Sequence, residues 1–204
     1  MRLKILKQPS QRQDCIVGID EAGRGPVIGP MVIAGVAANE ETIKELEAIG
    51  VADSKTIAPT KRSELFDKIL SMVDGAAVVY VEPKTMDRWV QRKGLNVLEA
   101  KAMATIMTMF RHAKLYILDT PSSPRKFREY VTKFSNIEPS RILFEPKADM
   151  KYTIVAAASI IAKVLRDAEI TEIKRQTGVD FGSGYPSDPK TIQQLETILS
   201  LIHI

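Results

Sequence analysis

Residues 16–26 read Ile-Val-Gly-Ile-Asp-Glu-Ala-Gly-Arg-Gly-Pro. An apolar, β-branched run ends there in two adjacent carboxylates, Asp20 and Glu21, and a Gly-Arg-Gly turn follows at once. Two acids at the end of a strand, beside a backbone that can approach a ligand closely, suit a hard metal ion and phosphate chemistry. Taken alone, the stretch also allows a second interpretation, a β-turn with solvated acids.

The composition indicates one globular domain. The chain has 204 residues, of which 45% are hydrophobic and 26% charged, as in ordinary soluble proteins. Its single cysteine, Cys15, excludes an intramolecular disulfide. The first residues lack the apolar core of a signal peptide, and no apolar run is long enough to span a bilayer. We therefore expect a cytoplasmic protein that does not enter a membrane.

The charged and metal-binding residue types narrow the possible ligands. A net charge of +4 is compatible with an anionic partner such as nucleic acid, but it does not require one. Two histidines, His112 and His203, and one cysteine are too few for an ordinary zinc site. A bound metal would therefore have oxygen ligands, which favours Mg²⁺ or Mn²⁺.

The order of apolar runs and helical periodicity predicts an α/β fold, a mixed β-sheet flanked by helices with a C-terminal helical portion. We expect strands at residues 15–19, 27–37, 76–81, 115–118 and 141–144. We expect helices at residues 60–73, 95–113, 125–134, 152–176 and 189–201. Residues 1–204 are expected to form a single domain, in which residues from about 178 form a loop and a C-terminal helix.

Two further carboxylates could join Asp20 and Glu21. Asp119 ends the apolar run 115–118, and ligands gather at the carboxyl ends of such strands in open α/β sheets. Asp149 precedes the long apolar helix, whose small side chains would allow it to pack closely against the sheet. Helix capping or solvation remains an alternative for each of these two acids.

Four carboxylates with no histidine nearby would repel one another unless cations lay among them. Two divalent ions would relieve this repulsion, and they could clamp the attacking and leaving oxygens of a phosphoryl transfer. The pattern therefore predicts a two-metal catalytic site formed by Asp20, Glu21, Asp119 and Asp149.

Several blocks of the sequence, in the same order, resemble type 2 ribonucleases H (ribonuclease HII). The resemblance rests on residues 18–26, 52–55, 118–119, 147–152 and 156–167. A last block, Gly-Ser-Gly-Tyr-Pro-Ser-Asp-Pro at residues 182–189, is similar to the archaeal and eukaryotic branch rather than the bacterial one. The blocks extend from about residue 16 to about residue 190, which makes the resemblance far more specific than any single motif.

The resemblance implies a ribonuclease H-like fold and an endoribonuclease activity. Such an enzyme cuts the RNA strand of RNA–DNA hybrids and cleaves 5′ of single ribonucleotides in duplex DNA, leaving 3′-hydroxyl and 5′-phosphate ends. By the same resemblance, Asp20 would bridge two Mg²⁺ or Mn²⁺ ions. Glu21 and Asp119 would complete the leaving-group site, and Asp149 would serve the ion that activates water. A monomer is expected.

The resemblance also implies substrate contacts. Gly23, Arg24 and Gly25 would read the 2′-hydroxyl of a ribonucleotide, largely through backbone groups. Tyr185 would lie against the sugar, and Lys55 would contact a phosphate. A plain tight turn, a structural tyrosine and a solvated lysine are the respective alternatives.

Other interpretations are weaker. A non-catalytic binder of hybrid duplexes would not need the four acids. A nucleotide-binding module is disfavoured because no Gly-Lys-Ser/Thr follows Gly25. Trp89, near Arg88 and Arg92, is expected to be a packing residue on a short helix. Lys163 and Arg166 of the long helix are left without an assigned role.

Overall fold

The computed structural model describes residues 1–10, 12–51, 58–120 and 124–202. Its centre is a six-stranded sheet with the order β1-β4-β3-β2-β5-β6. The strands are β1 (Arg2–Lys7), β2 (Ile16–Ala22), β3 (Met31–Ala38), β4 (Gly75–Val81), β5 (Leu115–Asp119) and β6 (Ile142–Glu145). The pairs β1–β4, β4–β3 and β3–β2 are antiparallel, whereas β2–β5 and β5–β6 are parallel. The predicted mixed sheet is confirmed.

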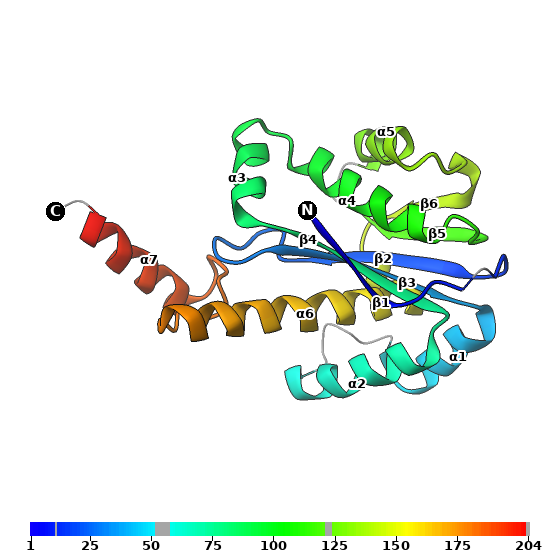
Figure 1. Cartoon of the computed structure of the whole chain (residues 1–204), viewed down its shortest axis with the longest axis horizontal. Coiled ribbons are helices and arrows are strands. Elements are labelled where there is room, and N and C mark those ends of the chain that lie inside the picture. Colours follow the sequence, from blue (N-terminus) through cyan, green and yellow to red (C-terminus); the bar gives the residue numbers. More distant parts are fainter. Residues whose placement is uncertain (11, 52–57, 121–123, 203–204) are drawn as a thin grey trace.

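Helices cover both faces of the sheet (Figure 1). One face carries α3 (Pro83–Gln91), α4 (Leu95–Met109) and α5 (Pro124–Ser135), and the other carries α1 (Glu40–Ala48), α2 (Pro59–Met72) and α6 (Thr153–Thr177). Successive side chains of β3 enter the two apolar cores in turn, Ile33 on the α4 side and Ala34 on the α6 side. This explains why β3 is a continuous apolar run.

The C-terminal helix α7 (Pro189–Ile202) follows a loop and extends beyond the end of α6 (Figure 1). Trp89 lies on the short helix α3 and packs partly buried against the α4-side core, so its predicted packing role is confirmed. Across the described ranges, the helices are all too short or too polar to cross a membrane.

Several local differences separate the structure from the sequence-based expectations. The helix expected at residues 95–113 ends at Met109, and the strand expected at residues 15–19 extends to Ala22. The strand β1 was not predicted because it is an exposed edge strand with alternating charged residues, paired only with β4. The helix α1 was not predicted either; its start is marked by Asn39, whose Oδ1 accepts a hydrogen bond from the Thr42 amide at 2.8 Å. The strand expected from residue 27 begins only at Met31, because Gly29 has a φ of 95° and Pro30 has no amide hydrogen.

One contact between backbones places α6 against the sheet. A Cβ atom at Gly18 of β2 would lie 2.3 Å from the carbonyl oxygen of Ile154 in the first turn of α6. Only glycine therefore permits this approach. The contact brings the start of α6, and the residues just before it, next to the strand that carries Asp20 and Glu21.

Candidate active site

The four carboxylates singled out in the sequence lie at one edge of the sheet. Asp20 and Glu21 are in the last residues of β2, where they pair with Ala34 and Ile33 of β3. They are therefore part of the strand rather than of the turn after it. Asp119 is the last residue of β5, the parallel neighbour of β2. Asp149 lies in the short 3₁₀ helix η3 (Ala148–Met150), directly before α6.

Adjacent residues of a strand point to opposite faces, and this separates Asp20 from Glu21. Asp20 points toward α6, where the buried Ser159 partly opposes the rise in the pKa of Asp20. Glu21 points toward α4, where Glu99 is the charged group with the largest effect on the pKa of Glu21. The acids therefore lie on both faces of the sheet, Asp20 facing α6 and Glu21 facing α4.

Backbone amides hold two of the aspartates. Asp20 Oδ1 accepts a hydrogen bond from the Glu21 amide at 2.7 Å. Asp119 Oδ1 accepts hydrogen bonds from the amides of Thr120 at 2.8 Å and Ala148 at 3.2 Å. The bond to Ala148 ties the end of β5 to the segment that carries Asp149. Lys147 turns the chain there with a φ of 57°, an uncommon conformation for a residue other than glycine.

Burial and mutual repulsion make these carboxyl groups difficult to ionise. Burial, and then the charges of Glu21 and Asp119, raises the pKa of Asp20 well above its usual range. Burial, followed by the charges of Glu99 and Asp119, raises the pKa of Glu21 to about 8. Burial also raises the pKa of Asp119, with a smaller contribution from Asp149, although backbone hydrogen bonds oppose the shift. A cation at this edge would favour the ionised forms.

The donor chemistry fits a hard divalent ion. All four side chains offer carboxylate oxygens, the ligands that Mg²⁺ and Mn²⁺ prefer. Nevertheless, within the described part of the chain no three His, Cys, Asp or Glu side chains lie close enough together to surround an ion. The opposite directions of Asp20 and Glu21, and the amides that hold Asp20 and Asp119, account for this spread. Ion binding would have to draw the carboxylates together.

The turn at residues 23–25 lies directly after these acids. Gly23 has a φ of 85°, and a Cβ atom there would lie 2.4 Å from the Pro30 carbonyl oxygen. This glycine is therefore needed for the shape of the turn. Gly25 is exposed, and a Cβ atom built on it would meet open space. A ligand can thus approach the backbone of the turn on the side of Gly25.

Tyr185 lies on a loop that contacts residues 27 and 28, just after the turn, and Arg166 of α6 lies between the two segments. The Arg166 guanidinium carbon is 4.4 Å from the centre of the Tyr185 ring. Arg166 Nη2 donates hydrogen bonds to the carbonyl oxygens of Ser183 at 2.9 Å and Ile28 at 3.3 Å. The amide of Val27 donates to the Gly184 carbonyl oxygen at 2.9 Å. The sequence pattern had left Arg166 without a role; the structure makes it the clamp between these two loops.

Lys163, also unassigned from sequence, contacts a residue that lies beside Asp20. Its Nζ donates a hydrogen bond to Ser159 Oγ at 2.6 Å, and Ser159 is one of the groups that oppose the rise in the pKa of Asp20. Lys55, the predicted phosphate contact, lies outside the described residues.

The sequence analysis missed a fifth acid, Glu99 of α4. Its side chain is fully buried, and Oε2 accepts a hydrogen bond from Arg24 Nε at 2.7 Å. Burial raises the pKa of Glu99, while Arg24 opposes the shift. An acid in the middle of an otherwise apolar helix, between Leu98 and Ala100, was the signal that could have drawn attention to it.

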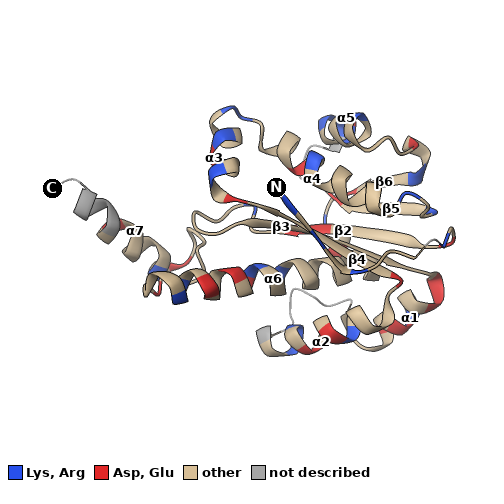
Figure 2. Cartoon of the chain, in the orientation of Figure 1, with Lys and Arg blue, Asp and Glu red and all other residues tan. Residues whose placement is uncertain are grey.

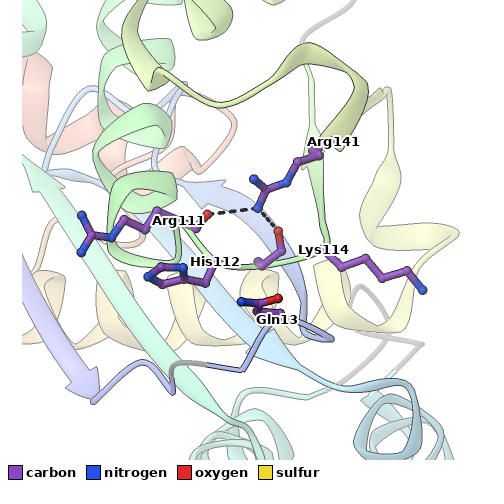
Figure 3. Close-up of a pocket in the computed structure, with 6 residues that line it drawn as sticks. Gln13, Arg111, His112, Lys114 and Arg141 are labelled. Carbon is purple, nitrogen blue, oxygen red and sulfur yellow. Dashed lines mark hydrogen bonds between the residues drawn. The ribbon is translucent and has the colours of Figure 1, made fainter.

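A separate cavity lies at the other end of β5 (Figure 3). Gln13, Arg111, His112, Lys114 and Arg141 line it, and Arg141 donates hydrogen bonds to the carbonyl oxygens of Arg111 and Ala113. None of the acids described above lines this cavity. It is therefore distinct from the candidate active site.

Comparisons with known proteins agree with this fold. The family model for Ribonuclease HII matches residues 17–200. Ribonuclease HII of Pyrococcus furiosus is 45% identical over 184 residues, which cover 89% of this chain and 80% of the relative. The crystal structure of ribonuclease H2 from Pyrococcus horikoshii OT3 superposes with a TM-score of 0.82 and 40% identity, over 93% of this chain and 89% of that one.

A more distant neighbour bears on the metal. The structure of Bst-RNase HIII in complex with Mn²⁺ matches with a TM-score of 0.73 and 26% identity, over 85% of this chain and 58% of that one. The two Pyrococcus relatives agree with the archaeal resemblance of residues 182–189. From its sequence, its fold and the acids at the edge of its sheet, the chain belongs to the ribonuclease HII family of type 2 ribonuclease H endonucleases, which act on RNA–DNA hybrids.

Proposed function

We propose that this endonuclease hydrolyses hybrids and single embedded ribonucleotides with two divalent ions held by Asp20, Glu21, Asp119 and Asp149. It would cut 5′ of the ribonucleotide and leave 3′-hydroxyl and 5′-phosphate ends. The observation that supports the proposal is that the elements carrying these acids, the ends of β2 and β5 and the segment before α6, are neighbours in the fold. The raised pKa values of three of them are the expected mark of a cation-binding cluster.

We assign each of the four acids a role in the reaction according to its position. When bound, divalent ions supply the positive charge that stabilises the attacking and leaving oxygens of phosphodiester hydrolysis. Asp20, the most buried of the β2 pair, suits a position shared by both ions. We assign Glu21 and Asp119 to the leaving-group side and Asp149 to the water side. The two amides that hold Asp119 would keep its carboxylate in a fixed orientation.

Recognition of the ribose would come from the loops beside the acids. The turn of Gly23, Arg24 and Gly25 would meet the 2′-hydroxyl with backbone groups, which can both donate and accept hydrogen bonds. Tyr185 would pack against the sugar. The Arg166 contacts support this assignment, because they join the Tyr185 loop to Ile28, a few residues after the turn.

Basic side chains would hold the phosphates of the duplex. Lysine and arginine residues lie along α3 and α5, on the α4 side of the sheet (Figure 2). They include Lys84, Arg88, Arg125 and Lys126. Such residues contact the nucleic-acid backbone without reading sequence. Lys55 is proposed as a further phosphate contact. We propose that the enzyme works as a monomer in the cytoplasm, on hybrids and ribonucleotide-containing duplex DNA and with no membrane partner.

The proposal is tested with labelled duplex DNA that contains one ribonucleotide. Purified protein is incubated with it in Mg²⁺, Mn²⁺ or EDTA, with an all-deoxy duplex of the same sequence as the control. We expect cleavage only with a divalent ion, only in the ribonucleotide duplex, and only on its 5′ side. Extension by a polymerase would identify the 3′-hydroxyl. Cleavage in EDTA would contradict the metal mechanism, and cleavage of the all-deoxy duplex would contradict the substrate assignment.

A further inference from the structure

Arg24 is the only residue of the Gly23–Gly25 turn that has a side chain, and this side chain points into the protein. Its Nε donates a hydrogen bond to Glu99 Oε2 at 2.7 Å, and its Nη2 donates to Asn96 Oδ1 at 2.6 Å. Both acceptors lie on α4, one turn apart. The guanidinium group therefore anchors the turn to α4 through two hydrogen bonds.

The arrangement would be unusual if Glu99 served stability alone. The Glu99 side chain is 1% exposed, on a helix whose neighbouring residues Leu98 and Ala100 belong to the apolar core. Its second oxygen, Oε1, has no hydrogen-bond partner within the described part of the chain. Replacing a buried ion pair by apolar residues is often neutral or stabilising, so this pair is weak support for the fold. Its geometric effect is to fix Arg24.

The turn has a particular need for such a fixed point. Glycines on both sides of Arg24 leave the backbone with wide conformational freedom, which costs entropy when a ligand orders it. Gly23 is confined by the Pro30 carbonyl, but Gly25 faces open space. A tether at Arg24 therefore restricts the backbone on the Gly25 side of the turn, where no atom of the described residues lies within 4 Å of a Cβ atom built on Gly25.

We propose that Glu99 and Asn96 of α4 are positioning residues for ribose recognition: they hold Arg24, and Arg24 holds the backbone of the turn toward the 2′-hydroxyl. The inference rests on the proposed function, because it explains how that recognition surface is kept in place. It assigns the Arg24 side chain to the protein and not to the substrate. The competing assignment is that Glu99, whose charge acts on Glu21, serves ion binding directly.

A set of variants separates the two assignments: Arg24→Ala, Glu99→Ala, Glu99→Gln, Asn96→Ala and the double variant of Arg24→Ala with Glu99→Ala. Two quantities are measured. One is kcat/KM on the duplex with one ribonucleotide, and the other is Mg²⁺ affinity by calorimetry. Glu47→Ala, an exposed acid on α1, is the matched control. Thermal unfolding of each variant reports whether it is folded.

Loss of a hydrogen bond between charged groups predicts that Arg24→Ala and Glu99→Ala each lower kcat/KM about 10- to 100-fold. The double variant should be no worse than the poorer single variant, because both act through the same contact. Glu99→Gln keeps an acceptor for Arg24 Nε and should stay within about 3-fold of the wild type. Asn96→Ala should give an intermediate loss, and Mg²⁺ affinity should change little in every variant.

A second readout addresses the ribose itself. In EDTA, the ratio of affinities for the ribonucleotide duplex and the all-deoxy duplex should fall toward one in Arg24→Ala and Glu99→Ala. A structural defect elsewhere would weaken both duplexes alike and overturn the inference. Losses that multiply in the double variant, or a Glu99→Gln that loses Mg²⁺ affinity, would also overturn it. Failure of the wild type to cleave would instead overturn the proposed function, and with it this inference.

Discussion

Single carboxylates decide both the chemistry and the stability of this edge of the sheet. At Asp119, opposing effects act on the ionised carboxylate. Two backbone amides donate hydrogen bonds to Oδ1 and favour the ionised form, whereas burial and the charge of Asp149 disfavour it and raise the pKa. An asparagine at this position would keep an oxygen that can accept both amide hydrogen bonds. It would remove the charge that a cation needs.

We therefore expect Asp119→Asn to lower single-turnover cleavage by at least about 100-fold, as the loss of one transition-state-stabilising group does. In EDTA its melting temperature should be higher than that of the wild type, because one repulsive charge is gone. Fluorimetric melting and a gel assay measure the two effects. Asp67→Asn, an exposed acid on α2, is the control. Retained activity in Asp119→Asn would remove Asp119 from the catalytic set.

Tyr185 gives a second test at the level of one side chain. Its ring lies over the Arg166 guanidinium, so the aromatic face and not only the hydroxyl contributes to its position. Tyr185→Ala should lower cleavage at a single embedded ribonucleotide on the order of 100-fold, the cost of a displacement of about 1 Å of the reacting group. Mg²⁺ affinity by calorimetry should not change.

Tyr185→Phe distinguishes the two parts of the side chain. It should be nearly as active as the wild type if the ring packs against the sugar. It should be as poor as Tyr185→Ala if the hydroxyl makes the contact. Wild-type cleavage by Tyr185→Ala would show that the residue is only structural.

At the level of single residues, the sequence reveals acids at strand ends but not contacts between residues that are far apart in the chain. Asp20 and Asp119 could be found because acids that end apolar runs mark strand ends. Glu99 could not be linked to Arg24, because 75 positions separate them and only the packing of α4 against the sheet brings them together. Arg166 could not be assigned to substrate or to solvent from the sequence, since its hydrogen bonds to Ile28 and Ser183 go to backbone carbonyls that no sequence pattern encodes.

At the scale of whole elements, the site depends on how closely α6 approaches β2. The helix lies against β2 and β3 along the α6-side core, and its first turn meets β2 at Gly18. The small apolar residues of α6 predicted such an approach, and this part of the fold is confirmed. β1 and α1 lacked an equivalent signal, because an edge strand and a short polar helix bury few side chains.

The Gly18 contact yields a stability prediction. In Gly18→Ala the added methyl group would meet the Ile154 carbonyl oxygen at 2.3 Å, so either β2 or α6 must move. We expect a loss of about 3 kcal/mol in the free energy of unfolding, at the upper end of the cost of overpacking. Urea denaturation measures it. Gly25→Ala is the control, because its Cβ atom meets nothing within 4 Å and should leave stability nearly unchanged. Equal stability of both variants would contradict the close approach.

For the molecule as a whole, the main electrostatic feature is a cluster of buried acids in a chain of net charge +4. The basic residues of α3 and α5 lie at the surface (Figure 2), where they can attract a polyanion. Asp20, Asp149 and Glu99 are buried and Glu21 and Asp119 are half-buried, so water screens their repulsion only weakly. Folding must therefore work against this repulsion whenever the carboxyl groups are ionised and no cation is present.

This repulsion predicts that the stability of the metal-free protein falls as pH rises above the ordinary pKa of a carboxyl group. The pKa values of Asp20, Glu21, Asp119 and Glu99 are all raised by folding, that of Glu21 to about 8. Between the ordinary carboxyl pKa, about 4, and these raised values, the folded chain holds protons that the unfolded chain has released. The free energy of unfolding must then fall as pH rises, by up to about 1.4 kcal/mol per pH unit for each such group.

Melting temperatures in EDTA should accordingly decrease from pH 5 to pH 9. The exposed carboxyl groups with lowered pKa values, such as Asp180 and Asp188, titrate below this window and do not reverse the trend.

Saturating Mg²⁺ should stabilise the protein increasingly toward pH 9, because an ion that binds only the folded state adds its binding free energy to stability. The curves with and without Mg²⁺ should therefore meet near pH 5 and separate above pH 7. In Asp119→Asn the slope in EDTA should be shallower than in the wild type, since one raised group is missing. A melting temperature in EDTA that rises between pH 5 and pH 9 would show that the acids are not buried against one another, and the two-ion proposal would lose its electrostatic basis.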